Sequence, residues 1–262
     1  MKRLTVGLLC LVLLTSAAMG QQAGRVNSSR QSAGQAALDQ AAAANKYAFV
    51  FFWRDKNPQT DKAWAELKPL VDKYSDSATV VAVKVSDPNE KQLAARYGVD
   101  RVWLPMVLAI APCGAITKTI TGEINDEQLQ AAFVSPCTQH CLKALQDKKL
   151  VFVCVKDGES LQPADAVPAG VQEFKADQRF GPSTEVLLLN AKDAAEAAFL
   201  ETLKVDARQA KPLTVFLAPP GSVIGHFDAR ATKDDLVKQV VASQSNPCAG
   251  GKCGPNGCGP KK

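Results

Sequence analysis

The stretch AFVFFW, residues 48–53, decides the fold of this chain. It contains only apolar and aromatic residues, and the polar turn RDKNPQT follows it directly. An unbroken apolar run of this length is typical of a strand buried on both faces at the centre of a parallel or mixed sheet. A helix should follow, because Asn57 can cap it and Pro58 suits its first position, where no N–H is needed.

The segments after this strand alternate between helical and strand patterns in a fixed order. We expect a helix containing Pro69, a strand over residues 78–85, a helix over 88–97, strands ending at Ile110 and Thr121, and a helix over 126–133. This order, with Leu104-Pro105 placed just before the third strand, resembles the thioredoxin-like proteins. The resemblance implies an α/β fold with a central mixed sheet flanked by helices.

In the thioredoxin-like family a C-x-x-C redox pair follows the first strand, and a cis proline before the third strand faces it. The resemblance puts this proline at Pro105. It puts the redox pair at Asn57 and Thr60 when counted from the end of the strand, or at Asp61 and Trp64 when counted back from the proline inside the helix. Neither alternative contains a thiol, so the resemblance implies the fold without its standard dithiol chemistry.

The pattern of the first half begins again at Ser135-Pro136. A helix over 137–146, buried strands over 150–155 and 185–190, a helix capped by Asn190 and a strand opened by Lys211-Pro212 repeat the earlier order. Pro105 and Pro212 each come just before a strand. Seven residues after each of them lies the proline of an A-P-x-G turn, and twenty residues after each of them the last helix starts, at Asn125 and Thr232. Matched offsets of this kind indicate an internal repeat.

The predicted organisation is therefore two tandem thioredoxin-like domains. We expect a signal peptide at 1–20, a flexible leader at 21–35, the domains at 36–134 and 135–243, and a tail rich in Cys, Gly and Pro at 244–262. The second domain has no C-x-x-C after its first strand either. Cys154 lies on that strand and is expected to be a small buried core residue.

The first twenty residues have the pattern of a secretory signal peptide. Lys2 and Arg3 precede an apolar run over residues 4–14, and small residues at Ala18 and Gly20 favour cleavage before Gln21. We expect a periplasmic or secreted mature protein without a membrane span, because no later segment is apolar enough. Its formal charge falls from +5 to +3 when the two basic residues leave, and the remaining charges are mixed, which does not favour nucleic-acid binding.

Seven of the eight cysteines remain after cleavage, and three of them lie in the tail. Cys248, Cys253 and Cys258 are spaced five residues apart within Gly- and Pro-rich turns, which can bring three sulfurs to one point. Thiolates suit soft or borderline metal ions, with Cu(I) and Zn(II) as the candidates; zinc would need a fourth ligand from elsewhere. A disulfide knot, or a tail without specific chemistry, is the alternative.

A second cluster comprises Cys137, His140 and Cys141. If Ser135 caps this helix, Cys137 lies in its first turn, where amide dipoles lower the pKa of a thiol, and the three side chains share a helix face. The cluster is a candidate soft-metal site or reactive dithiol. It resembles in composition the C-x-x-x-C plus His of the copper-handling Sco branch, in which the cysteines follow the first strand rather than precede it. A structural disulfide to the tail or to Cys113 is the alternative.

The remaining candidate site is the groove where the redox pair would have been. Asn57, Thr60, Trp103 and Pro105 should line it, and Trp103 could contact an extended peptide from a protein partner. Cys113 occupies a turn at the far end of the third strand, away from this groove. His226 alternates along a strand and is expected to be a solvated or core-edge histidine. With two histidines and no nucleophile motif, no Ser-His-Asp set can be assembled.

These observations favour a non-catalytic extracytoplasmic protein that uses the thioredoxin-like fold as a binding scaffold. Its cysteines would bind a soft metal or form disulfides. The competing hypothesis is a thiol-disulfide oxidoreductase that uses a relocated pair, Cys137/Cys141 or two tail cysteines. A third hypothesis is a purely structural adaptor, whose tail would influence neither metal content nor partner binding.

Overall fold

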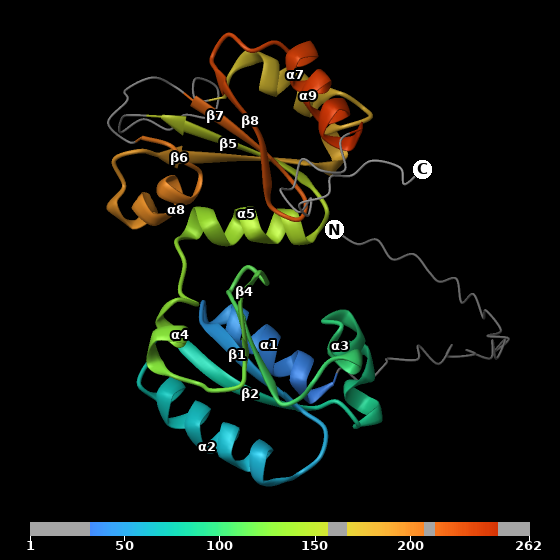
Figure 1. Cartoon of the computed structure of the whole chain (residues 1–262), viewed down its shortest axis with the longest axis vertical. Helices are drawn as coiled ribbons and strands as arrows, with labels where there is room; N and C mark the ends of the chain where they lie inside the picture. Colours follow the sequence, from blue (N-terminus) through green and yellow to red (C-terminus); the bar gives the residue numbers. More distant parts are fainter. Residues whose placement is uncertain (1–31, 157–166, 207–212, 246–262) are drawn as a thin grey trace, which may run out of the picture. The chain divides into compact units, whose positions relative to one another are not determined.

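The computed structural model describes residues 32–156, 167–206 and 213–245. They form two α/β domains that follow one another along the chain (Figure 1). The predicted signal peptide, residues 21–31 of the leader and residues 246–262 of the tail lie outside the described residues. None of the helices in the described part of the chain is long and apolar enough to cross a bilayer.

The first domain is built around a four-stranded mixed sheet. Its strands are β1 (Tyr47–Trp53), β2 (Ala78–Lys84), β3 (Met106–Ile110) and β4 (Ile116–Thr121), in the order β2-β1-β3-β4. β1 pairs in parallel with β2 and antiparallel with β3, and β3 pairs antiparallel with β4. β1 is buried along six of its seven residues, as the apolar run predicts for a central strand.

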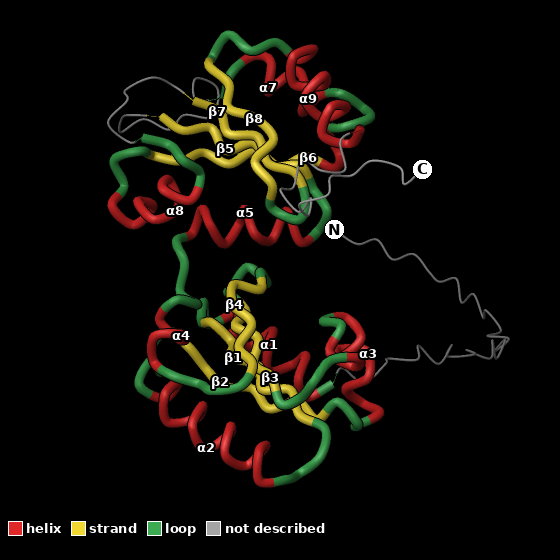
Figure 2. Tube along the Cα trace, viewed as in Figure 1, coloured by secondary structure: helices red, strands yellow, loops and turns green. Residues whose placement is uncertain are grey.

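Helices cover both faces of this sheet (Figure 2). They are α1 (Ala33–Ala43), α2 (Pro58–Asp72), α3 (Lys91–Arg96) and α4 (Asp126–Gln130), with 3₁₀ turns at Pro88–Glu90 and Val99–Arg101. Phe49 and Phe51 of β1 pack with α2 and α4, whereas Val50 and Phe52 pack with α1 and α3. This alternation follows from the two-residue period of a strand, which sends successive side chains to opposite faces.

The second domain has the same architecture. Its sheet has the order β6-β5-β7-β8, formed by β5 (Leu150–Lys156), β6 (Thr184–Asn190), β7 (Leu213–Ala218) and β8 (Ser222–Asp228). Its helices are α5 (Pro136–Gln146), α7 (Ala169–Ala176), α8 (Ala197–Thr202) and α9 (Lys233–Ser245), with 3₁₀ turns at Gly181–Ser183 and Ala194–Glu196. One core cluster joins α5 and α8 to the sheet, and another joins α7 and α9 to its other face.

The two sheets also share their register, so the predicted repeat is confirmed at the level of single residue pairs. Tyr47 opposes Ala78 in the first sheet and Leu150 opposes Thr184 in the second. The pairing of the third and fourth strands shifts between Ala109 and Ile110, and again between Phe216 and Leu217. These positions correspond under the 107-residue offset that relates β3 to β7.

Several element boundaries differ from the sequence prediction because of local capping. α1 begins at Ala33, within the predicted leader, because the Ser32 side chain accepts from the Gln35 N–H. Asn190 does not cap a helix, since its side chain accepts from the Lys192 N–H in a turn. The helical segment starts instead after Asp193, whose side chain accepts from the Ala195 N–H.

The peptide bond between Leu104 and Pro105 is cis, as the resemblance implied. The corresponding bond at Lys211-Pro212 lies outside the described residues. A further cis bond, which the sequence did not predict, joins Pro219 to Pro220 in the turn between β7 and β8.

Candidate functional site

The start of α2 (Pro58–Asp72), with its N-cap residue, contains two of the residues predicted to line a groove. Asn57 is the N-cap residue, and its side chain accepts from the Thr60 N–H at 2.9 Å. Thr60 is buried, and its hydroxyl donates to the Asp55 carbonyl at 3.0 Å. Because α2 begins at Pro58, Thr60 lies in its first turn, while Asp61 and Trp64 lie further into the helix. Both polar side chains are engaged in local structure that stabilises the turn.

The loop before β3 meets this turn at one edge of the sheet. Phe52 opposes Met106 in the register of β1 and β3, which brings the cis residue Pro105 beside the end of β1. The Arg54 guanidinium also donates to the Asp100 carbonyl at 3.1 Å, tying the loop to the turn. In this loop the Trp103 side chain is 95% exposed, far more than any other large hydrophobic side chain among the described residues.

A cavity of about 310 Å³ lies beside the start of α2. Three aromatic side chains, Phe51, Trp53 and Trp64, form much of its wall, and the Phe51 and Trp64 ring centroids are 5.3 Å apart. Of the four residues predicted to line a groove, only Thr60 lines this cavity. The sequence indicated that Trp53 and Trp64 are core or groove-lining aromatics, but it did not single out Phe51, which belongs to the apolar run expected to be buried. The period of two places residues 51 and 53 on one face of β1.

The Cys137 cluster on α5 differs from the sequence prediction. Cys141 is buried and Cys137 is partly buried, whereas His140 is exposed, so the three side chains do not share one environment. Burial is the main cause that raises the pKa of Cys137 to about 12, and the Glu196 carboxylate adds to it. Burial also raises the pKa of Cys141 to about 11. The expectation of a lowered pKa was wrong because desolvation and a nearby negative charge outweigh the helix dipole.

A buried carboxylate that the sequence analysis did not single out holds the start of α5. Glu196 accepts from the Cys137 N–H at 3.0 Å and from the Ser135 hydroxyl. In the first domain Glu90 has the same role at α1, accepting from the Gly34 N–H at 2.9 Å. Carboxylates are favoured at helix N-termini because they satisfy free amides and complement the dipole. An acidic residue three positions after Asp87 and after Asp193 was the signal available in the sequence.

The other candidate residues have ordinary surroundings. Cys154 is buried on β5 and its sulfur accepts from the Thr214 hydroxyl at 3.8 Å, which confirms the predicted core role. His226 lies 2.9 Å from the Leu203 carbonyl through its Nε2 atom. Cys113 is a partly buried residue packed against the first core. No disulfide joins any of the four cysteines that the structure describes, which are Cys113, Cys137, Cys141 and Cys154.

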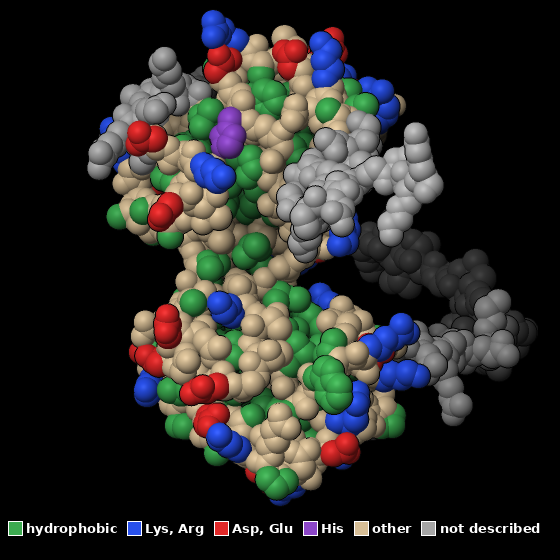
Figure 3. Space-filling view, in the orientation of Figure 1, with side chains coloured by type: hydrophobic (Ala, Val, Ile, Leu, Met, Phe, Trp, Pro, Cys, Tyr) green, Lys and Arg blue, Asp and Glu red, His purple; other side chains and the backbone are tan. Residues whose placement is uncertain are grey.

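Of the two metal sites predicted from the sequence, the structure describes the one on α5 but not the one in the tail. Cys248, Cys253 and Cys258 lie outside the described residues. Within residues 32–156, 167–206 and 213–245, no three His, Cys, Asp or Glu side chains are grouped so that they could hold an ion. On the face drawn in Figure 3, basic and acidic side chains are interspersed on each domain.

The sheet order, the flanking helices and the cis proline define a thioredoxin-like fold, present in two tandem domains. No family model matches the chain, and no curated protein matches it. Among solved structures, the chain is similar to the N21Q mutant of thioredoxin from Halobacterium salinarum NRC-1, with 22% identity and a TM-score of 0.30. That match covers 39% of this chain and 89% of the thioredoxin.

Two further solved structures show similar levels of likeness. StoA from Bacillus subtilis is 20% identical with a TM-score of 0.27, over 34% of this chain and 82% of its own. A designed protein is 18% identical with a TM-score of 0.30, over 39% of this chain and 84% of its own. Each match covers about the length of one domain.

Proposed function

We propose that this chain is a non-catalytic extracytoplasmic scaffold whose first domain binds an extended segment of a protein partner. The observation that carries the proposal is Trp103, which is 95% exposed and lies two residues before the cis residue Pro105. The partner segment would lie along the edge formed by Asn57, Thr60, Trp103 and Pro105.

An exposed tryptophan contributes a large apolar surface to a docking site. Full burial of an aromatic side chain removes about 150–250 Å² from water. At about 25 cal/mol per Å² this is worth roughly 4–6 kcal/mol before the costs of association are subtracted. Tryptophan is accordingly enriched among the residues that dominate binding energy.

The aromatic cavity beside α2 supports the same proposal. Its volume of about 310 Å³ suits one apolar or aromatic side chain of the partner segment, and Phe51, Trp53 and Trp64 would contact it. Lys56 and Asp61 also line it, so polar groups of both signs are available to the backbone or flanking residues of the segment.

The chemistry of the start of α2 favours binding over turnover. Disulfide exchange requires a thiolate as nucleophile, and Asn57 and Thr60 supply none. The competing hypothesis names two relocated pairs. Cys137 and Cys141 have raised pKa values and are therefore protonated near pH 7, whereas the tail cysteines lie outside the described residues. We therefore propose no exchange reaction for the described residues.

A selection for bound peptides tests the proposal. Full-length protein is used to select from a library of unstructured peptides, and the affinity of each selected peptide is measured for Trp103→Ala. We expect a loss of about 30-fold or more, the equivalent of 2 kcal/mol, for a dominant contact residue. Val241→Ala, on α9 of the second domain, is the control because its side chain is 57% exposed. Equal affinities in wild type and Trp103→Ala would overturn the proposal.

Soft-metal binding by the tail cysteines is the second part of the proposed function, supported by the spacing of Cys248, Cys253 and Cys258. The native intact mass of the exported protein tests it. A mass increment matching Cu or Zn that disappears in Cys253→Ser supports the proposal, and an increment retained in that variant contradicts it. The same spectrum tests the proposed export, because cleavage before Gln21 fixes the mass of the mature chain.

A further inference from the structure

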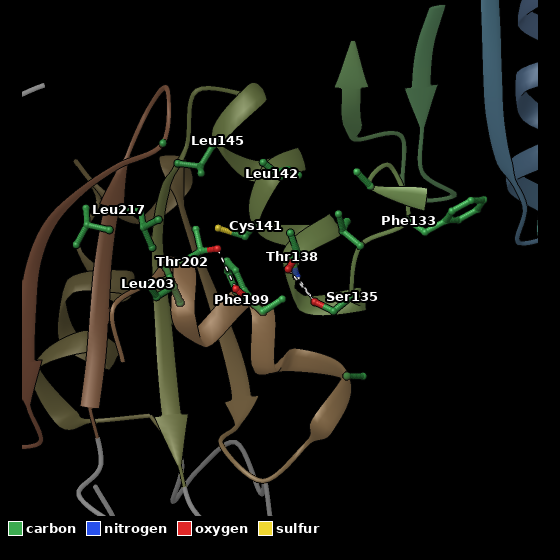
Figure 4. Close-up of a pocket in the computed structure, with 16 residues that line it drawn as sticks. Phe133, Ser135, Thr138, Cys141, Leu142, Leu145, Phe199, Thr202, Leu203 and Leu217 are labelled. Carbon is green, nitrogen blue, oxygen red and sulfur yellow. Dashed lines mark hydrogen bonds between the residues drawn. The ribbon is translucent and has the colours of Figure 1, made fainter. Parts of the chain in front are cut away.

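An apolar cavity that the proposed function does not use is lined mainly by residues of the second domain, together with Ala131, Phe133 and Val134 from the end of the first. It has a volume of about 490 Å³ and lies between α5 and α8, next to the turn that joins β7 and β8 (Figure 4). Cys141, Phe199, Leu203 and Leu217 contribute to its wall. Of the described residues, sixteen line this α5–α8 cavity and none of these is charged, although 22% of the residues in the chain are charged.

The polar groups of the cavity wall already have partners within the chain. The Ser135 hydroxyl bonds to the Glu196 carboxylate and to the Thr138 hydroxyl, and the Thr202 hydroxyl donates to the Ala198 carbonyl at 2.9 Å. Burial raises the pKa of Cys141 to about 11, so its thiol is neutral near pH 7. A charged or strongly polar ligand would therefore lose its hydration without gaining partners.

The first domain provides an internal comparison for this place in the fold. Gln35 and Arg96 hold the positions of Thr138 and Thr202, because the caps Ser32 and Ser135 and the carboxylates Glu90 and Glu196 correspond. The Arg96 guanidinium donates to the Gln35 side chain at 3.2 Å, and the Gln35 amide donates to Asp39 at 2.8 Å. A polar network thus bridges α1 and α3.

The second domain lacks the groups that make this bridge. Threonines replace the glutamine and the arginine, and Leu142 replaces the aspartate. Larger core side chains are also exchanged for smaller ones, since Cys141 stands at the position of Leu38 and Leu203 at that of Tyr97. This place in the fold is therefore lined by uncharged side chains in the second domain, whereas in the first domain it carries charged side chains, Arg96 and Asp39.

We propose that the α5–α8 cavity binds an uncharged, apolar molecule of small-molecule size. Its volume lies within the range of small-molecule sites, about 300–1,000 Å³, and such sites are mostly apolar. The absence of charge in the lining and the internal pairing of its hydroxyls favour a neutral hydrocarbon or aromatic group over a lipid phosphate or a carboxylate. This proposal does not depend on the peptide groove of the first domain.

Titration of the full-length protein with N-phenyl-1-naphthylamine, an uncharged apolar dye, tests the proposal. We expect saturable binding and competition by 1-octanol. The variant Thr138→Gln/Thr202→Arg transfers the bridging pair of the first domain into the second, and it should weaken dye binding by roughly tenfold or more, the equivalent of about 1.4 kcal/mol. Thr119→Arg, an exposed threonine of β4, is the matched control and should bind as wild type does.

Methyl NMR during the octanol titration locates the ligand. Shifts confined to Leu145, Leu203 and Val223 support the cavity, whereas shifts at Leu38 and Leu93 in the first domain contradict it. The proposal is overturned if the dye does not saturate, or if the double variant binds as tightly as wild type. Sedimentation at the same concentrations must give a monomer; a dimer that excludes the dye would show that a second copy covers the cavity and would equally overturn the proposal.

Discussion

Substitution of Gly34 by alanine tests the packing that holds the start of α1. A Cβ atom added at this position would lie 2.7 Å from the Glu90 Oε2 atom, 2.7 Å from Leu93 Cδ2 and 2.9 Å from Val83 Cγ2. Overpacking of this kind costs typically about 1–3 kcal/mol. The gain in helix propensity from replacing glycine is at most about 1 kcal/mol. We therefore expect the cost of overpacking to exceed this gain, so that the substitution destabilises the domain.

The structure adds a second reason for a loss of stability. Any movement of Glu90 that relieves the contact weakens its hydrogen bond to the Gly34 N–H, and bonds to charged groups contribute about 1.5–3 kcal/mol. Among the residues that the structure describes, the Glu90 Oε2 atom has no hydrogen-bond partner, so the carboxylate is held chiefly by packing and by its bond to the Gly34 N–H. We expect Gly34→Ala to lower the free energy of unfolding of the first domain by about 1–2 kcal/mol.

Tryptophan fluorescence reports this change selectively, because Trp53, Trp64 and Trp103 all lie in the first domain. With an m value near the low end of the usual range, the urea midpoint should fall by roughly 1 M. Cys137→Ala is the matched control, since Cys137 holds the corresponding position in the second domain and the change adds no atoms. An unchanged or raised midpoint in Gly34→Ala would refute the packing argument.

Three further predictions concern capping and titration. Asn57→Ala removes the cap of α2 and should cost about 1 kcal/mol in the same fluorescence assay; an unchanged midpoint would contradict the cap. Asp177 accepts from Arg179 and Lys233, which hold its pKa below the usual range. The stability it contributes is therefore present above its unfolded pKa and is lost as pH falls. Acid unfolding followed by circular dichroism should be less steep in Asp177→Asn, and an identical acid limb would argue against this linkage. Burial and a nearby carboxylate raise the pKa of Cys137 to about 12, so its thiol should react slowly with iodoacetamide at pH 8, with a rate that keeps rising above pH 9. A plateau near pH 9, read by peptide mass spectrometry, would disprove the raised pKa.

The fold was largely predictable because its determinants are local or periodic. The apolar run at residues 48–53 identified the central strand, and the matched offsets from Pro105 and Pro212 identified the repeat. The predicted ends of helices were less accurate where a capping side chain can accept a hydrogen bond from any of several nearby backbone N–H groups. Ser32 extends α1, and Asn190 serves a turn rather than a helix.

The electrostatics of the candidate sites were the least predictable part. The effect of the helix dipole on Cys137 can be read from its position in the first turn of α5. The opposing effects depend on burial and on Glu196, which lies 59 residues away in sequence and is brought close only by the fold. The exposure of Trp103 likewise depends on what packs around its loop, which no local pattern determines.

The comparison of the two domains refines this point. Corresponding residues such as Gln35 and Thr138 are recognisable from the sequence offsets, but the effect of the difference between them on the packing of the helices is not. Only the packed helices show that Arg96 reaches Gln35 and that Thr202 lines the α5–α8 cavity.

The measurement that tests the central claim most directly is disulfide reduction by the full-length protein. Insulin reduction with dithiothreitol as electron donor is compared for wild type and for Asn57→Cys/Thr60→Cys, which places two thiols at the start of α2. We predict no turnover above background in wild type and measurable turnover in the double variant, because disulfide exchange needs a thiolate, which Asn57 and Thr60 do not supply and the two introduced cysteines do. Wild-type turnover equal to that of the double variant would contradict the account of a non-catalytic scaffold.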